Sequence, residues 1–304
     1  MILITGSSGF IGSSLVKILP FEMLKLMGRS ITSNQKNYYQ KSLNKNENYA
    51  DVLQNVEVVI HCAAKNNNKY DRANDIDSFY DVNVEGTINL ATQAAHAGVK
   101  RFIYLSSIKV NGEITSKDKP FTSFDKPAPK DSYGMSKFEA EVGLKKIAAV
   151  TDMEVVIIRP PLVYGADVKG NFAIMLNIIK KGIPLPFGSV NNKRSLVSVF
   201  NLVDLIVKCV DHPRAANQTF LISDGNDLST TELLRKLGET LGKSPILLPV
   251  PVFIMASIAK LLGKKTIANR LFGSLQVDIK HTCETLSWQP PLSIEESMKR
   301  SFRD

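Results

Sequence analysis

Three glycines directly after the first apolar run constrain the fold of this chain more than any other feature. Residues 2–4 are Ile-Leu-Ile, and Gly6, Gly9 and Gly12 follow at a spacing of three. Residues 10–19 carry apolar side chains at helical spacing, so the glycines form a turn between a strand and a helix. Glycine lets the backbone turn tightly and approach a pyrophosphate, which rests on the first turn of the helix. The pattern therefore predicts a dinucleotide-binding turn.

Apolar runs that suit buried parallel strands alternate with helix-like segments through the first half of the chain. This alternation predicts an α/β fold, a Rossmann-type doubly wound parallel sheet. We expect the NAD(P)-binding domain over residues 1–165, with a later strand returning to it near 196–222. Prolines punctuate the pattern after Gly165, and we expect a smaller C-terminal α/β substrate-binding domain over 166–304. The expected strands are 23–27, 56–62, 102–105 and 155–158, and the expected helices are 51–55, 82–97 and 133–149.

Charge and cysteine content exclude several classes of protein. The net charge of +9 fits an anionic ligand such as a nucleotide diphosphate, and the basic residues are too scattered to predict nucleic-acid binding. Cys62, Cys209 and Cys283 lie far apart, so neither a disulfide framework nor a metal site is expected. Because Met1 leads at once into the first strand, without a secretory leader, we expect a cytoplasmic protein.

One apolar stretch, residues 250–262, resembles a membrane element. Its thirteen residues fall short of the ~20 that a spanning helix needs, so we expect a buried helix and no stable membrane insertion. Lys264 and Lys265 follow it directly, which leaves peripheral membrane contact as the less favoured alternative.

The end of the second strand bears on the choice of cofactor. An acid at this point binds the adenosine ribose and repels a 2′-phosphate. Arg29 and Ser30 stand there instead, and a guanidinium with a hydroxyl suits a phosphate. We therefore favour NADP(H), with NAD(H) as the alternative.

Tyr133 and Lys137 lie four residues apart, hence on one face of a predicted helix. Lowering the pKa of a phenol by ~3 units, so that it works near neutral pH, needs about 4 kcal/mol of phenolate stabilisation, to which the ammonium contributes. Ser107 ends a predicted strand 26 residues earlier, at the sheet edge where ligands bind. Together Ser107, Tyr133 and Lys137 predict a catalytic site, in which the serine hydrogen-bonds the reacting oxygen.

These motifs, in this order, resemble the extended short-chain dehydrogenase/reductase family, which contains UDP-sugar 4-epimerases, sugar dehydratases and 4-keto-sugar reductases. The resemblance covers nearly the whole chain. It also includes residues 61–64 (His-Cys-Ala-Ala), 83–87 (Asn-Val-Glu-Gly-Thr) and 159–165 (Arg-Pro-Pro-Leu-Val-Tyr-Gly). The cofactor-binding residues expected from the motifs and the resemblance together are Gly6, Gly9, Phe10, Ile11, Gly12, Arg29, Ser30, Ala63, Ala64, Lys137 and Pro160.

The resemblance implies a UDP-sugar substrate. Arg194 lies in a segment similar to the one whose arginine grips the nucleotide diphosphate, and Asn171 lies where relatives place a substrate loop. With Ser107 and Tyr133, these are the expected substrate contacts. The family's dehydratases carry Thr-Asp-Glu after the catalytic strand, whereas this chain reads Ser107-Ile108-Lys109, which disfavours dehydration.

Two reactions fit the same residues. We favour reduction of a UDP-4-keto-6-deoxy-N-acetylhexosamine at C4 by NADPH, in the synthesis of a surface-polysaccharide precursor. The alternative is 4-epimerisation of UDP-glucose or UDP-N-acetylglucosamine with tightly bound NAD. A binding protein or sensor without turnover is a further alternative, disfavoured because Tyr133 and Lys137 are both present. The resemblance also implies a homodimer, formed through the helices at 82–97 and 133–149.

Overall fold

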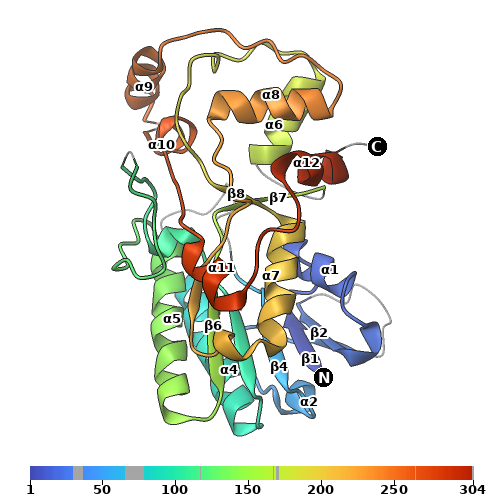
Figure 1. The fold of residues 1–304 in the computed structure, drawn as a ribbon. Coiled ribbons are helices and arrows are strands. Elements are labelled where there is room, and N and C mark those ends of the chain that lie inside the picture. Colours follow the sequence, from blue (N-terminus) through green and yellow to red (C-terminus); the bar gives the residue numbers. More distant parts are fainter. Residues whose placement is uncertain are drawn as a thin grey trace.

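The computed structural model describes residues 1–29, 37–65, 79–116, 118–166, 168, 171–263 and 265–302. Its centre is one parallel sheet of seven strands (Figure 1), ordered β3-β2-β1-β4-β5-β6-β9. The chain runs outward from β1 in both directions, so the topological switch lies between β1 and β4. This confirms the predicted doubly wound fold. In sheet order the strands are β3 (Tyr38–Gln40), β2 (Leu24–Gly28), β1 (Ile2–Thr5), β4 (Val58–His61), β5 (Arg101–Leu105), β6 (Glu154–Arg159) and β9 (Thr219–Leu221).

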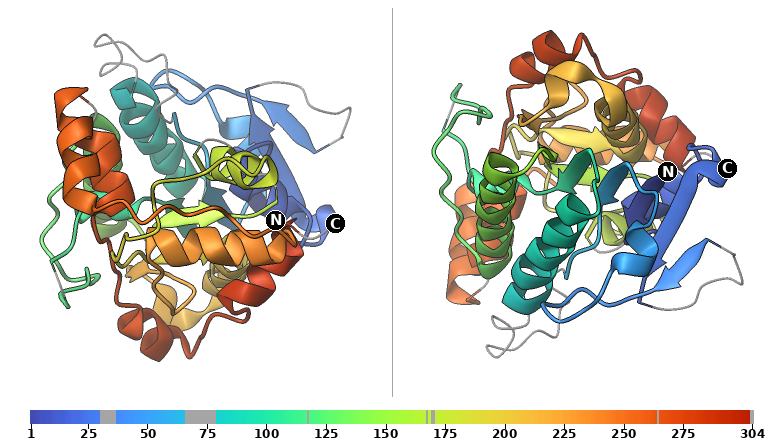
Figure 2. Two further views of the ribbon diagram at one scale, coloured as in Figure 1. Left: turned by 90° about the horizontal axis from the view of Figure 1, so that it is seen from above. Right: turned by 90° about the horizontal axis from the view of Figure 1, so that it is seen from below.

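Helices cover both faces of the sheet because its strands are apolar on both sides. Figure 2 shows α4 and α5 on the opposite side of the sheet from α7 and α11. Alternate strand residues supply the two cores, so that Ile60 packs towards one set of helices and Val59 towards the other. The first face carries α1 (Phe10–Val16), α7 (Val199–Asp211) and α11 (Lys280–Leu286), and the second α2 (Ala50–Leu53), α4 (Gly86–His96) and α5 (Ser132–Val150).

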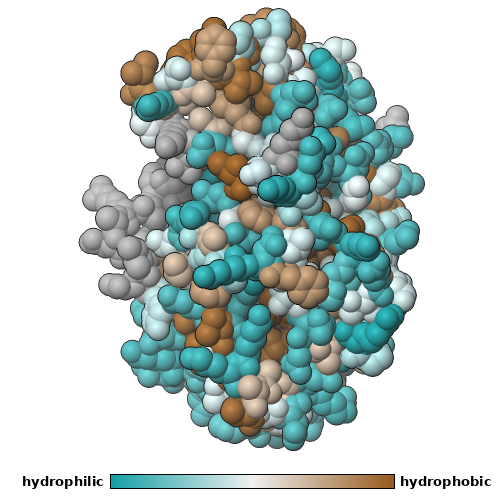
Figure 3. All heavy atoms as spheres, turned by 60° about the vertical axis from the view of Figure 1, so that its left-hand side comes forward, coloured by the Kyte–Doolittle hydropathy of each residue, from teal (hydrophilic) through white to brown (hydrophobic). Residues whose placement is uncertain are grey.

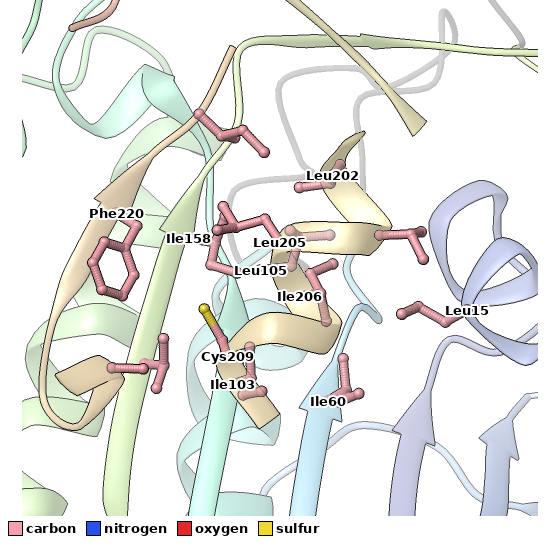
Figure 4. Packing of buried hydrophobic residues seen from close by; sticks show 14 of the residues in the cluster. Leu15, Ile60, Ile103, Leu105, Ile158, Leu202, Leu205, Ile206, Cys209 and Phe220 are labelled. Atoms are coloured by element: carbon pink, nitrogen blue, oxygen red, sulfur yellow. The ribbon is translucent and has the colours of Figure 1, made fainter. Parts of the chain in front are cut away.

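Helix α7 forms the largest contact with the first face. Its buried stripe, Leu202, Leu205, Ile206 and Cys209, repeats every three to four residues and points at the strands (Figure 4). Ser198 caps the helix by accepting a hydrogen bond from the Asn201 backbone N–H at 3.1 Å. The following strand, β9, completes the sheet beside β6. The division into domains at residue 165/166 stays a prediction.

A second layer of elements lies beyond the carboxyl edge of the sheet (Figure 1). A parallel pair of short strands forms its base, and Tyr164, Phe172 and Leu234 belong to its own apolar core. Ser229 and Glu232 form a capping box at the start of α8. The elements are β7 (Leu162–Tyr164), α6 (Asn171–Lys180), β8 (Leu196–Ser198), α8 (Thr230–Thr240), α9 (Val252–Leu261), α10 (Lys265–Phe272) and α12 (Ile294–Phe302).

Two expectations about helices need correction. The predicted helix at 82–97 is two elements, a π-helical turn over Tyr80–Glu85 followed by α4. The predicted buried helix at 250–262 forms as α9, but Met255 is its only buried residue, so the prediction of burial is wrong. The reason is that α9 is apolar on two faces and only one packs inward. Among the described residues, no helix has both the length and the apolar composition needed to cross a bilayer.

Candidate active site

The glycine turn joins β1 to α1 at the carboxyl edge of the sheet. Gly6 has φ +66°, a conformation that favours glycine. A Cβ on Gly12 would lie 2.2 Å from the Gly6 carbonyl oxygen, and a Cβ on Gly6 would lie 2.8 Å from the Ala63 backbone nitrogen. The first N–H groups of α1, from Phe10 and Ile11, have no acceptor within the helix. The glycines therefore let the turn pack closely on itself and on Ala63, and the N–H groups at the start of α1 suit the pyrophosphate of a dinucleotide.

A buried hydrogen-bond network holds the end of β4 against this turn. His61 is fully buried, with Nδ1 2.8 Å from Thr5 Oγ1 and Nε2 3.0 Å from Thr87 Oγ1. The Ala63 backbone N–H donates to the same Thr5 oxygen at 3.2 Å. Burial, and then the charge of Lys137, lower the pKa of His61 to about 3, so its ring is neutral. The network fixes the backbone of Ala63 beside Gly6, and Ala64 follows it in the chain.

The two serines after β5 point in different directions because successive strand residues alternate. Ser106 is buried and its hydroxyl donates to Glu141 Oε1 at 2.5 Å. Ser107 is half-buried and extended, and its Oγ accepts from the Lys109 backbone N–H at 3.3 Å. Only Ser107 therefore keeps its hydroxyl at the sheet edge.

Helix α5 carries Tyr133 in its first turn and Lys137 one turn later. Asp131 caps the helix by accepting a hydrogen bond from the Gly134 N–H at 2.7 Å. A Cβ on Gly134 would lie 3.0 Å from the Lys109 carbonyl oxygen, so the segment after Ser107 packs directly on this turn. Lys137 is 2 % exposed, and its Nζ donates to the Leu105 carbonyl oxygen at 2.8 Å.

Lys109 connects the Ser107 segment to Tyr133. Its ammonium pairs with Asp131 and lies 5.7 Å from the centre of the Tyr133 ring. Phe79 contacts the same ring edge-on, with 6.4 Å between ring centres. The predicted catalytic residues are thus brought to one corner of the sheet edge, where β5 and α5 meet.

Burial disfavours the phenolate form of Tyr133 and the ammonium form of Lys137. It lowers the pKa of Lys137 to about 8. Burial, and then the Asp131 carboxylate, raise the pKa of Tyr133 above its ordinary value. Tyr133 is therefore a proton donor at neutral pH unless further positive charge is placed beside it.

A buried ion pair behind the site was not predicted. Glu141 and Arg159 are 1 % and 2 % exposed and form two hydrogen bonds, of 2.9 Å from Nε to Oε1 and 2.5 Å from Nη2 to Oε2. Arg159 also donates to Asn111 Oδ1 at 2.9 Å. The available signal was the position of Glu141, four residues after Lys137 and hence on the same face of α5.

Asn83 has a similar supporting position that its sequence motif did not reveal. It lies in the π-helical turn and is 1 % exposed. Its side chain accepts from the Lys65 N–H at 2.7 Å and donates to Ser136 Oγ at 3.0 Å. Asn83 thereby ties the segment after β4 to the first turn of α5.

The remaining cofactor predictions lie along the same edge. Arg29 follows β2 and is exposed, and its carbonyl accepts from Gln40 Nε2 at 3.1 Å. Pro160 follows β6, and its carbonyl accepts from the Ile108 N–H at 3.0 Å. Ser30 lies outside the described residues.

Arg194 stands in the layer above the sheet. Its backbone pairs with Leu228 and its Nη1 donates to the Gly273 carbonyl oxygen at 3.1 Å. Burial, and then the charge of Arg270, lower its pKa, so two guanidinium groups from distant parts of the chain lie close enough to repel. Arg270 was not predicted because nothing in its local sequence marks it. Asn171 begins α6, but its side chain lies outside the described part of the structure.

Arg194 is connected to the catalytic corner through paired backbone segments. Residues 193–195 pair with 274–277, and Phe121 pairs with Val277 in turn. Asn111 Nδ2 donates to the Thr122 carbonyl oxygen at 2.9 Å. The loop that leads from Ser107 to Tyr133 is therefore in contact with the layer that holds Arg194.

Comparison with known proteins gives consistent relatives. Residues 2–223 match the NAD dependent epimerase/dehydratase family. A UDP-glucose 4-epimerase of Vibrio cholerae is 49% identical over 99% of this chain and 94% of its own length. The N-acetyl-alpha-D-glucosaminyl-diphospho-ditrans,octacis-undecaprenol 4-epimerase of Escherichia coli O157:H7 is 27% identical over 93% of this chain and 86% of its own.

Solved structures share the fold over nearly the whole chain. The UDP-glucose 4-epimerase of Thermotoga maritima, solved with UDP-glucose, superposes with a TM-score of 0.77 at 24% identity, over 99% of this chain and 96% of that one. A short-chain dehydrogenase/reductase superfamily protein of Agrobacterium tumefaciens, solved with bound NAD, superposes with a TM-score of 0.78 at 22% identity. The match covers 99% of this chain and 94% of that one.

Proposed function

Because this chain belongs to the NAD-dependent epimerase/dehydratase family, we propose that it catalyses hydride transfer at C4 of a UDP-sugar, using Ser107, Tyr133 and Lys137. The observation that supports the proposal is the packing of the segment after Ser107 on the first turn of α5, where Lys109 lies 5.7 Å from the centre of the Tyr133 ring. The glycine turn opens onto the same carboxyl edge of the sheet.

In this proposal each residue acts on a defined group of the substrate, the cofactor or the site. Tyr133 exchanges a proton with the C4 oxygen, and Ser107 hydrogen-bonds that oxygen. Lys137 binds the ribose of the dinucleotide and biases Tyr133 towards phenolate. The bound nicotinamide accepts or gives the hydride, and its oxidised form adds the positive charge that the buried Tyr133 needs. Arg194, together with Arg270, holds the diphosphate of the substrate.

We propose 4-epimerisation with retained NAD as the complete reaction. The relative that is 49% identical over almost the whole chain is a UDP-glucose 4-epimerase. The E. coli relative is also a 4-epimerase, although its sugar is carried by a polyprenol. The comparisons give no support to a preference for NADP(H).

The structure offers one observation in favour of the second candidate, a UDP-4-keto-sugar reductase. The residue that follows β2 is the exposed Arg29, and no carboxylate stands there to bind the adenosine ribose. A dinucleotide held less tightly suits a reductase, which must exchange it at every turnover.

Identification of the bound dinucleotide tests both candidates. The freshly purified protein is denatured and its released nucleotides are identified by mass spectrometry. Near-stoichiometric NAD, with interconversion of UDP-glucose and UDP-galactose in the absence of added cofactor, supports the epimerase. An empty site that binds added NADPH supports the reductase. If neither cofactor binds, the proposed function is wrong.

A further inference from the structure

Helix α9 has an apolar face that no described part of the chain covers. Ile254, Ile258 and Leu261 recur at spacings of four and three, so they share one side of the helix, and all three are exposed. Leu262, directly after the helix, is exposed as well. Leu261 is 87% exposed. The less exposed residues, Val252, Met255, Ala256 and Ala259, lie on the other side of the helix, which contacts α10. The outward face therefore contributes nothing to the core.

Neighbouring residues extend this face into a larger patch. Ile246 and Leu248 precede the helix and are exposed, and Phe253 in its first turn is 71% exposed. We call residues 246–262 the apolar end. Figure 3 shows hydrophobic side chains gathered at the end of the molecule where α9 lies. Large contiguous apolar patches are rare on soluble monomers, and they usually mark a site of interaction with a protein or a membrane.

The chain segment that contains the apolar end carries charge of one sign. Residues 240–277 contain no aspartate or glutamate, and they contain five basic residues, namely Lys243, Lys260, Lys264, Lys265 and Arg270. Lys260, in the last turn of α9, and Arg270 on α10 are exposed. A partner for this surface must therefore combine an apolar interior with negative charge.

We propose that the apolar end docks on an anionic membrane surface and holds the protein there peripherally. Ile258, Leu261 and Leu262 enter the boundary between headgroups and acyl chains, while Lys260 lies at the lipid phosphates. A second copy of the chain is a poorer occupant because it would bring two basic surfaces together. Arg270 is on α10, directly beside α9, so docking would also place the Arg194 side of the candidate site next to the lipid surface.

Vesicle co-sedimentation of the full-length protein tests this proposal. The protein is mixed with vesicles of phosphatidylcholine alone and with vesicles that also contain phosphatidylglycerol. We expect it to sediment with the second kind only, and to be released by high salt. Ile258→Gln combined with Leu261→Gln should lower the partition coefficient by about tenfold or more. Lys260→Gln should lower it by about fivefold.

Matched control variants distinguish binding through the apolar end from nonspecific adsorption to vesicles. Val150→Gln changes an apolar residue that is 81% exposed at the end of α5, and Lys126→Gln removes an exposed lysine elsewhere. Both should bind like wild type. Because Lys260→Gln removes only an exposed charge, it keeps the test decisive if the double variant folds poorly.

Three results would overturn the proposal. The first is equal partitioning of the wild type to both vesicles, or to neither. The second is unchanged binding by the folded double variant or by Lys260→Gln. The third is conversion of a dimer to a monomer by the double variant in sedimentation velocity, which would make the apolar end a contact between copies.

Discussion

The β5–α5 junction and helix α9 depart from the usual distribution of side chains in opposite directions. At the junction, Lys137, Glu141 and Arg159 are charged yet at most 2 % exposed. On α9, large apolar side chains face outward. Charged residues are rarely fully buried unless paired, and large exposed apolar patches are rare on monomers. Both regions therefore depart from what folding alone would select.

The two departures differ in how they are satisfied. Glu141 and Arg159 pair with each other, and Lys137 donates to a backbone carbonyl, so the buried charges find their partners inside the chain. The exposed face of α9 has no such partner among the described residues. The buried charges of Lys137, Glu141 and Arg159 are therefore satisfied within the chain, whereas the apolar end needs a surface from outside.

The largest expected effect is on turnover at the junction. Tyr133→Phe removes the proposed proton donor and should lower kcat by roughly 10²- to 10⁴-fold, the usual contribution of a positioned acid or base. Thermal stability should hardly change. The exposed Tyr80→Phe is the matched control and should leave kcat unchanged. Full turnover by Tyr133→Phe would show that this residue is not catalytic.

The second effect is on stability. Glu141→Ala leaves the Arg159 guanidinium buried without its partner and should lower the free energy of unfolding by about 3–5 kcal/mol in urea denaturation. The control is Glu57→Ala, which breaks the exposed ion pair between Lys100 and Glu57. It should leave the free energy of unfolding unchanged within error. A small change in Glu141→Ala would mean that water reaches Arg159 in solution.

Lys137→Met should act in the opposite sense on stability. The pKa of Lys137 is depressed to about 8 in the folded state, so burying its ammonium costs free energy below that pH. The wild type should therefore gain stability as pH rises from 8 towards 10.5. The variant should be inactive but more stable at pH 7, by up to about 3 kcal/mol, with the gain vanishing above pH 10.5. Denaturation midpoints across this pH range provide the measurement.

A smaller effect is expected at Lys109. Lys109→Met leaves the Asp131 charge unpaired beside Tyr133, which should raise the pKa of the phenol further. Oxidation of the sugar needs the phenolate, so it should be a few-fold slower at neutral pH, and the limb on which the rate rises with pH should move to higher pH. Lys130→Met, at an exposed lysine beside Asp131, is the control. If the wild type and Lys109→Met gave identical pH–rate profiles, Lys109 would have no influence on the pKa of Tyr133.

The smallest expected effect is on stability, at the exposed face of α9. Leu261→Gln should change the free energy of unfolding by less than about 0.5 kcal/mol, because the side chain is 87% exposed. Met255→Ala, on the inner face of the same helix, should cost about 2 kcal/mol. Similar losses for the two variants would show that the outer face is covered by the chain itself.

Local patterns predicted the parts of the structure that depend on nearby residues. The glycine turn, the strand that ends at Ser107 and the spacing of Tyr133 and Lys137 each follow from a few consecutive residues. The Glu141 to Arg159 pair and the approach of Arg270 to Arg194 join segments far apart in the chain, so no local pattern contains them. Burial of α9 was predicted wrongly because apolar composition does not say which face finds a partner.

Because residues 193–195 pair with residues 274–277, the two parts of the candidate site cannot fold at the same time during translation. The glycine turn, Ser107, Tyr133 and Lys137 all lie in the first half of the chain, and N-terminal segments fold first. The segment that holds Arg194 receives its partner strand only when residues 274–277 have emerged. A nascent chain can therefore complete its dinucleotide turn well before its substrate side closes, and bound dinucleotide would stabilise that intermediate while the rest is made.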